Sequence, residues 1–421
     1  MLITLVFIIG YLAIILEHSL KINKTATALI TGVLCWVVYV IGSNDHVLIS
    51  RQLLGHLGQI AGILFFLLSA MAIVELIDAH DGFDVITARI STTSERQLLW
   101  IICFLAFFLS AVLDNLTTTI IMISLLRKLV SATSKRMMYA GMVIIAANAG
   151  GAWSPIGDVT TTMLWISGQI TAANIVTTLF LPSVVCVLAP LIILSYKMKG
   201  RIEEGTITRS SAPHAAEQKI VLIAGLGAML FVPVFKTLTG LPPFMGILFS
   251  LGVLWVITEK LHKRKKEEEK GVYSVMRALS KADVPTVLFF LGILLAISAL
   301  ESTHQLSALA TIMDEKISNL NIIAMSIGLL SAVVDNVPLV AATMGMYDLS
   351  TYPTDHFFWE FIAYTTGTGG SCLILGSAAG VAAMGMEKIS FTWYLKQFTL
   401  PALAGYFAGA LMYMAQHYLI G

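Results

Sequence analysis

The sequence predicts an all-α polytopic membrane protein made of two inverted repeats, with about ten crossing helices, two re-entrant helical hairpins and two interrupted helices. Hydrophobic residues make up 57% of the 421 residues and charged residues only 12%, which is too little polar surface to cover a soluble globule. Ala-Val-Leu-Asp-Asn at 111–115 recurs as Ala-Val-Val-Asp-Asn at 332–336, 221 positions later. The glycine pair at 150–151 recurs at 369–370, 219 positions later.

The overall charge and the cysteines exclude several classes of function. A net charge of +1 gives no basic surface for nucleic acid. The four cysteines are isolated inside apolar runs, so we expect neither a disulfide framework nor a transition-metal centre. The first apolar run lacks a preceding basic segment and is interpreted as a retained span. We expect no cofactor.

Apolar windows define the expected elements. The first repeat covers 1–196, a polar cytoplasmic linker covers 197–217, and the second repeat covers 218–421. The windows at 98–130 and 320–347 carry the Asp-Asn pairs near their middles, and we interpret both as hairpins that enter and leave on one side. The ten crossings are expected at 2–16, 26–42, 59–77, 137–168, 173–196, 218–237, 244–259, 284–300, 360–385 and 391–419.

The distribution of lysine and arginine supports this topology. With both hairpins re-entrant, only Arg51, Lys236 and Lys316 of the 26 Lys and Arg residues fall outside, and the rest lie on the cytoplasmic side. The termini are then both periplasmic. Each repeat has five crossings, an odd number, so the second repeat is inverted relative to the first.

The crossings at 137–168 and 360–385 are expected to be interrupted. The first contains Gly150, Gly151, Pro155 and Gly157, and the second contains four glycines between 367 and 376. Glycine costs about 1 kcal/mol and proline about 3 kcal/mol inside a helix, so both stretches should unwind. Unwound backbone at this depth lines a cavity or is packed in protein, and its carbonyls are available to cations.

The two hairpin tips and two interruptions define the candidate site. An aspartate inside the membrane is costly and is a functional candidate by default. The predicted cation- and proton-binding residues are Asp114, Asn115, Asn148, Ser154, Asp158, Thr160, Thr161, Ser331, Asp335, Asn336, Thr368 and Ser371, with Thr117, Thr118 and Thr366 as further polar neighbours. Nearly all offer oxygen, and we expect no Arg, Lys or His at these depths, so the set favours a cation such as Na⁺, held by Asp114, Asp158 and Asp335.

Three carboxylates in one low-dielectric site cannot all be charged cheaply. At least one should therefore hold a proton when no cation is present. Cation and proton then compete for the same oxygens, which suffices for antiport if access changes only when the site is occupied. Glu75 lies deep enough to serve as an auxiliary proton relay.

Simpler roles remain open for these residues. An Asp-Asn pair in an apolar run can cap a helix, and glycine pairs can serve close helix packing. Serine and threonine hydroxyls in membrane helices often bond to the backbone four residues earlier.

The motifs resemble those of the NhaD-type sodium/proton antiporters of the ion transporter superfamily, which is related to arsenite permeases and sodium/dicarboxylate symporters. The resemblance rests on Leu-Asp-Asn-Leu-Thr-Thr-Thr at 113–119 and on Asn-Ala-Gly-Gly-Ala-Trp-Ser-Pro-Ile-Gly-Asp at 148–158, and it covers nearly the whole chain. It implies a homodimer whose transport domain moves like an elevator. The family positions that it carries over are Asp114, Asn115, Asn148, Asp158, Thr160, Thr161, Ser331, Asp335, Asn336 and Ser371.

These observations predict a Na⁺(Li⁺)/H⁺ antiporter of the bacterial inner membrane, not an enzyme, with Na⁺, Li⁺, H⁺ and the lipid bilayer as its partners. The alternative is an anion transporter of the same superfamily, for arsenite or a dicarboxylate. In dicarboxylate transporters the hairpin tips read Ser-Asn-Thr, whereas Leu-Asp-Asn and Val-Asp-Asn stand here. A carboxylate at the tip should repel an anion. An intramembrane aspartyl protease fits less well, because neither hairpin has the Gly-x-Gly-Asp motif of such proteases.

Overall fold

The computed structural model describes residues 2–87, 90, 92–198, 200–201, 215–263 and 273–420. Within these ranges the protein is helical and has no β-strand beyond one isolated bridge between Ser94 and Arg201. Most of the predicted linker at 197–217 and of the charged run at 262–270 lies outside the described residues.

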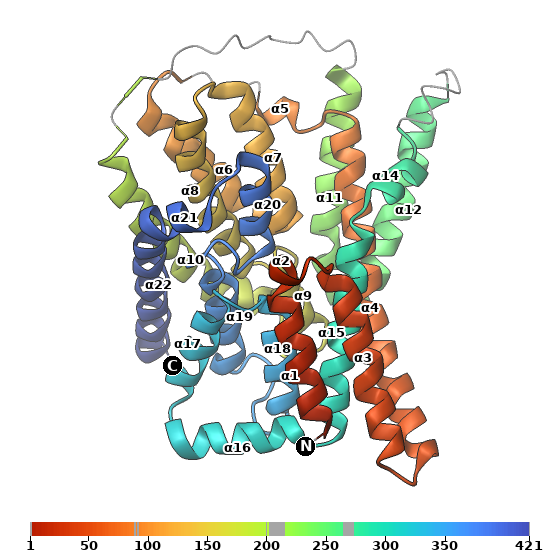
Figure 1. The fold of residues 1–421 in the computed structure, drawn as a ribbon. Helices are drawn as coiled ribbons and strands as arrows, with labels where there is room; N and C mark the ends of the chain where they lie inside the picture. The colour runs from red at the N-terminus through yellow and green to blue at the C-terminus, as the bar shows by residue number, and fades with distance from the viewer. Residues whose placement is uncertain are drawn as a thin grey trace.

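Ten helices lie in the first predicted repeat as far as it is described (Figure 1). They are α1 (Leu2–Ile15), α2 (Glu17–Leu20), α3 (Lys24–Ile41), α4 (His46–Ala79), α5 (Asp84–Thr87), α6 (Glu95–Leu113), α7 (Asn115–Leu129), α8 (Thr133–Ala152), α9 (Val159–Ile166) and α10 (Ala172–Ser195).

The described helices of the second predicted repeat continue to the C-terminus. They are α11 (Ala215–Thr239), α12 (Pro243–His262), α14 (Val275–Lys281), α15 (Val284–Ser302), α16 (Gln305–Ile317), α17 (Leu320–Leu330), α18 (Asn336–Met346), α19 (Phe357–Gly369), α20 (Ala378–Glu387), α21 (Phe391–Gln397) and α22 (Thr399–Ile420).

The protein is a polytopic membrane protein. Among the described residues, seven helices are long and apolar enough to cross a membrane, namely α3, α4, α6, α10, α11, α12 and α15. The pair α21 and α22 gives an eighth span if it is counted as one, although the two helices are bent by 54°.

Two expected windows differ from the observed helices. The helix α4 has 34 residues and begins at His46, well before the predicted window at 59–77. Its first turns contain Arg51 and His56, which end a hydropathy window but do not end a helix. The window at 391–419 forms two helices, α21 and α22, instead of one. Pro401 has no N–H to donate to the carbonyl of Gln397, so a continuous helix would lose this hydrogen bond. In the first turn of α22 the missing N–H costs nothing.

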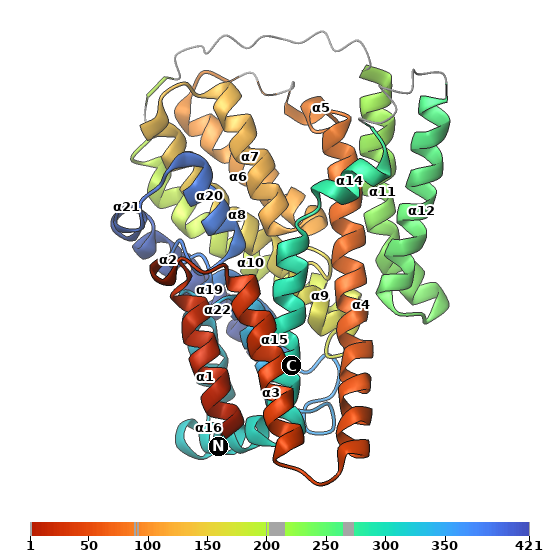
Figure 2. The ribbon, with the colours of Figure 1, turned by 45° about the vertical axis from the view of Figure 1, so that its right-hand side comes forward.

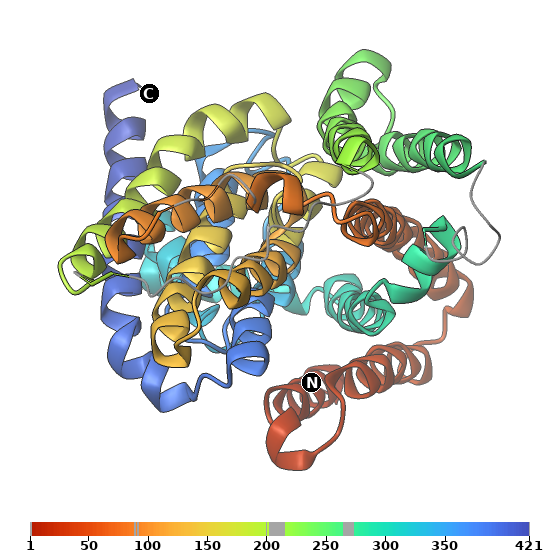
Figure 3. The ribbon, with the colours of Figure 1, turned by 90° about the horizontal axis from the view of Figure 1, so that it is seen from above.

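The helices gather into two groups, which separate clearly when the molecule is seen from above (Figure 3). In the first group α3 packs on α1 and α15, while α4 packs on α12 and α15. The second group contains the pairs α6–α8, α10–α22 and α17–α19. Contacts between α15 and α18, and between α4 and α9, join the groups. Figure 2 shows α3, α15 and α4 standing side by side in front of α9.

The predicted hairpin windows form two helix-turn-helix units that approach from opposite ends of the molecule (Figure 1). The outer ends of α6 and α7 meet at the start of α8, where the Tyr139 hydroxyl donates to the carbonyl of Glu95 and Arg136 donates to the carbonyl of Val130. At the other end, Tyr347 after α18 donates to Asp314 in α16. The helix α16, which the sequence windows missed, lies across that end.

Ion pairs of the buried Glu387 with Arg127 and Arg136 fasten the end of α20 to the end of α7 and the start of α8. Glu387 is 4% exposed, and its two oxygens accept from Arg127 Nε at 2.7 Å and from Arg136 Nε at 3.0 Å. Because both carboxylate oxygens are paired with a guanidinium, the buried charge of Glu387 is compensated.

Candidate functional site

The turn between α6 and α7 is made by Asp114. Its φ of +91° lies in a region that residues other than glycine rarely adopt, at a cost of about 1–3 kcal/mol. The Asp114 side chain offsets part of that cost by capping α7, because its oxygens accept from the Thr117 amide at 2.8 Å and from the Thr117 hydroxyl at 2.7 Å. The capping role that the sequence left open is therefore real for Asp114.

The interrupted helices pack against the hairpins without any side chain between the backbones. A Cβ added to Gly150 would lie 2.8 Å from the carbonyl carbon of Phe107, and one added to Gly369 would lie 2.7 Å from that of Gly328. Gly376 is packed as closely as Gly369, because a Cβ added to it would lie 2.6 Å from the carbonyl oxygen of Ala332. The packing role of these glycines, the second open alternative, is therefore also real.

These contacts occur twice with the same spacing. The Ser110 hydroxyl donates to the carbonyl of Ala147 at 2.6 Å, and the Ser331 hydroxyl donates to that of Thr366 at 2.8 Å. Ser331 follows Ser110 by 221 positions and Thr366 follows Ala147 by 219, which are the offsets of the sequence repeat. Each hairpin therefore meets its own interrupted helix through equivalent contacts.

Amide side chains join the two halves at the centre. Asn115 Nδ2 donates to Asn148 Oδ1 at 3.0 Å, and Asn148 Nδ2 is 2.9 Å from the hydroxyl oxygens of both Ser371 and Ser377. Asn148 is fully buried. The structure thus brings together Asn115, Asn148 and Ser371, and adds Ser377, which the sequence set left out. The repeat could have found it, because Ser377 is the counterpart of Asp158 at the offset of 219.

Asp158 is the most enclosed of the three aspartates. It is 2% exposed, it caps α9 through the Thr160 amide at 3.4 Å, and its Oδ2 accepts from Asn336 Nδ2 at 3.1 Å. Asp114 and Asp335 both lie within electrostatic range of it. A buried carboxylate paired with a neutral amide keeps a strong preference for a proton or a cation nearby.

Asp335 differs from the other two aspartates because it faces a lysine. Its Oδ1 caps α18 through the Val337 amide at 3.2 Å, and its Oδ2 lies 3.8 Å from Lys24 Nζ. The expectation that no basic side chain reaches this level is therefore wrong. The sequence placed Lys24 in a cytoplasmic turn, whereas α1 is only 14 residues long and the turn after it lies at the height of α9 (Figure 1).

Most of the predicted hydroxyl ligands donate their proton to the backbone. Ser154 donates to the carbonyl of Ala111 at 2.5 Å, Thr161 to that of Asp158 at 2.9 Å, and Thr368 to that of Tyr364 at 2.6 Å. Such a hydroxyl still has oxygen lone pairs to offer. The Thr118 hydroxyl is different, because it is buried and has no hydrogen-bond partner among the described residues. It lies one turn beyond Asn115 on the same helical face.

Glu75 lies apart from this cluster. It is half-buried in α4, and its charged neighbours are Asp78 and Lys281. Within the described part of the chain, no hydrogen bond or ion pair joins it to the site aspartates.

The site offers oxygen atoms from separate side chains and does not form a metal centre in advance of binding. In the described ranges no group of three or more His, Cys, Asp or Glu side chains is placed to hold a metal ion. A cation here would combine carboxylate oxygen with neutral amide, hydroxyl and carbonyl oxygens.

Comparison with known proteins assigns the family. A family model described as a citrate transporter matches residues 11–367. A protein from Arabidopsis thaliana named sodium/proton antiporter 1 is 50% identical over 417 residues, which is 99% of this chain and 72% of the relative. Sodium/proton antiporter 2 of the same plant is 47% identical, covering 98% of this chain and 99% of the relative.

A bacterial relative matches over a similar length at lower identity. The Na⁺/H⁺ antiporter NhaD of Vibrio cholerae is 30% identical over 441 residues, covering 97% of this chain and 90% of the relative. The three relatives match nearly the whole chain, and the family model ends at residue 367, within the second interrupted helix. The chain therefore belongs to the NhaD-type sodium/proton antiporter family, within the group of transporters that the citrate transporter model describes.

Proposed function

We propose that this protein is a secondary active antiporter that exports Na⁺, or Li⁺, in exchange for H⁺. The observation that carries the proposal is the enclosed Asp158 carboxylate, which is 2% exposed and faces Asn336 of the other half at 3.1 Å. The names of the relatives from plants and bacteria support the same activity.

Competition between cation and proton at Asp158 provides the exchange chemistry. In the present arrangement the Asn336 amide nitrogen donates to Asp158 Oδ2. A cation or a proton at that oxygen would neutralise the buried charge, and the two exclude each other. When a cation is bound, rotation of the Asn336 amide would present its oxygen in place of its nitrogen. We propose that Asn115, Asn148, Ser371 and the Thr118 hydroxyl provide further oxygen ligands when the cation is bound.

Alternating access is proposed to come from two inverted repeats with re-entrant hairpins. The paired contacts of Ser110 with Ala147 and of Ser331 with Thr366 support the repeat, and the approach of the hairpins from opposite ends supports its inversion (Figure 1). We propose that the group containing the hairpins moves as the transport domain of an elevator. The group of α1, α3, α4, α11, α12 and α15 would be the scaffold and would provide the surface of a homodimer.

The rival is an anion transporter, and two observations favour it. Lys24 places a positive charge at the second hairpin tip, where the sequence predicted none, and the matching family model is named for citrate transport. Three aspartates oppose that single lysine, and Lys24 is already paired with one of them. An anion entering the site would therefore meet net negative charge.

Purified protein in proteoliposomes separates these functions. A pH-sensitive dye inside the vesicles should report proton movement when Na⁺ or Li⁺ is added outside, at neutral to alkaline pH. Citrate or a dicarboxylate at equal ionic strength should cause none. Asp158→Asn is the matched control, since it keeps the shape of the side chain and removes the exchangeable charge. If only the anion moves protons or accumulates, the antiporter proposal is wrong.

The remaining expectations stay predictions. They are the bacterial inner membrane, the periplasmic side for both termini and the use of Li⁺. The proposed exchange needs no cofactor, because Na⁺, Li⁺ and H⁺ are its substrates.

A further inference from the structure

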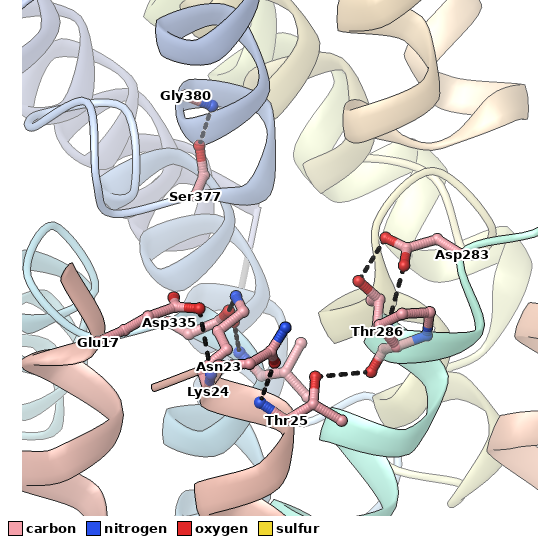
Figure 4. A network of polar contacts seen from close by, with 11 residues as sticks. Glu17, Asn23, Lys24, Thr25, Asp283, Thr286, Asp335, Ser377 and Gly380 are labelled. Carbon is pink, nitrogen blue, oxygen red and sulfur yellow. Dashed lines mark hydrogen bonds and ion pairs between the residues drawn. The ribbon is translucent and has the colours of Figure 1, made fainter. Parts of the chain in front are cut away.

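Lys24 occupies an unusual position for a lysine. It is the first residue of α3, and a positive charge at a helix N-terminus opposes the helix dipole. Its ammonium lies 3.8 Å from Asp335 Oδ2, and the two side chains are 34% and 24% exposed (Figure 4). The helix α3 gains nothing from this charge, so the partner that accounts for it is the aspartate on the other group of helices.

Hydrogen bonds hold the backbone around Lys24 in place. The Asn23 side chain caps α3 by accepting from the Thr25 amide at 2.8 Å, and Glu17 Oε1 accepts from the Lys24 amide at 3.1 Å. The Thr25 hydroxyl donates to the carbonyl of Pro285 at 3.0 Å, which fastens this turn to the start of α15. Figure 4 shows these residues beside one another. Lys24 is therefore presented from the proposed scaffold.

The Asp335 carboxylate uses its two oxygens differently. Oδ1 accepts from the Val337 amide and holds the hairpin tip, while Oδ2 faces Lys24. A separation of 3.8 Å exceeds hydrogen-bond length, so charge alone holds the pair. A metal cation bound at Oδ2 would lie within a few ångströms of the ammonium, and the two positive charges would repel each other.

The ammonium is in contact with an aromatic ring at the same time. Lys24 Nζ lies 4.6 Å from the ring centroid of Phe289 in α15, within the range of a cation–π contact. The lysine can therefore leave Asp335 and remain stabilised on the scaffold side. Tyr11 in α1 and Asp158 also lie within electrostatic range of Asp335, and the Glu17 carboxylate is hydrogen-bonded to the Lys24 amide in the same network.

We propose that Lys24 is an internal competitor of the transported cation at Asp335. In the empty site it neutralises Asp335 and links the two groups of helices, and cation binding at Oδ2 releases it from Asp335 so that the contact with Phe289 on the scaffold side remains. Lys24 is thus a positioning residue that couples occupancy of the site to the contact between scaffold and transport domain. The inference rests on the proposed cation exchange.

Direct Na⁺ binding to purified protein tests the competition. The Na⁺ concentration that gives half of the maximal thermal stabilisation should fall roughly two- to fivefold in Lys24→Gln, the size expected for losing a partly exposed charge pair. Lys24→Arg should keep the wild-type value. The control is Lys21→Gln, an exposed lysine in the same turn, which should change nothing. In an Asp335→Asn background, Lys24→Gln should have no further effect.

A measurement on wild-type protein makes the test independent of variant folding. Na⁺ should speed the reaction of Lys24 with an amine-acylating reagent, read by mass spectrometry, and leave that of Lys21 unchanged. Unchanged or weaker Na⁺ binding in Lys24→Gln, full additivity with Asp335→Asn, or no effect of Na⁺ on Lys24 labelling would each overturn the inference. Loss of Na⁺-driven proton movement in wild-type proteoliposomes would instead overturn the proposed function.

Discussion

Replacing Gly369 by alanine is a direct test of the backbone contact between α19 and the second hairpin. The added Cβ would lie 2.7 Å from the carbonyl carbon of Gly328 and 3.2 Å from Ser331 Oγ. A backbone carbonyl cannot rotate away as a side chain can, so α17 must shift. Overpacking of this kind costs about 1–3 kcal/mol. The Ser331 hydrogen bond to the carbonyl of Thr366, worth about 1 kcal/mol, would be stretched as well.

Alanine has a higher helix propensity than glycine, and this gain in stability offsets part of the packing cost. That gain is at most about 1 kcal/mol, and less at the end of a helix, so the net destabilisation is about 2 kcal/mol. Gly385→Ala is the matched control, because Gly385 lies in the last turn of α20 and its added Cβ meets nothing within 4 Å. That variant should be neutral or slightly more stable.

The assay is thermal unfolding in detergent, followed by size-exclusion chromatography, together with exchange in proteoliposomes. We expect Gly369→Ala to unfold at a clearly lower temperature than wild type and Gly385→Ala, and to exchange more slowly. If Gly369→Ala is as stable as Gly385→Ala, the hairpin and the interrupted helix do not pack as closely as described.

Three further predictions concern the site, its support and the topology. Asp158→Asn should abolish Na⁺-driven proton movement while leaving folding intact, and wild-type exchange should weaken as pH falls because protons then occupy the carboxylates. Glu387→Gln should lower stability by about 1–3 kcal/mol, because it removes the negative charge that pairs with Arg136 and with the half-exposed Arg127. Cysteines introduced in place of Arg96 and Ser131 should react with a membrane-impermeant reagent from one side of the membrane. A cysteine in place of Ser350 should react from the other side, since these exposed positions lie at opposite ends of the molecule.

Each of these has a result that contradicts it. Near wild-type exchange in Asp158→Asn would remove that residue from the site, and exchange that rises steadily towards acid pH would argue against proton competition. If Glu387→Gln unfolds at the wild-type temperature, the ion pairs of Glu387 do not stabilise the protein. Opposite accessibility of positions 96 and 131 would refute the first hairpin. The four native cysteines are buried and give a low labelling background.

The sequence by itself determined the membrane class, the helical windows and the breaks, because these depend on local composition and hydropathy. Asp114 and Pro155 mark where a helix cannot continue, whereas α8 continues through Gly150 and Gly151 to Ala152 and α19 ends at Gly369. The recurrence at offsets of 221 and 219 residues relates the two halves. The same information named Asn115, Asn148, Asp158 and Asn336, which the structure joins by hydrogen bonds in two separate pairs.

Only the tertiary structure decided which oxygens and charges face each other. Ser377 enters the site because Asn148 reaches it from the other half, 229 positions away. Lys24 reaches Asp335 because α1 is short and its turn ends beside the hairpin tip, which hydropathy windows do not record. Glu75 lies apart from the site because α4 is long and carries it towards Lys281. Distances between residues far apart in sequence depend on how helices pack, and packing is set by contacts that no local window contains.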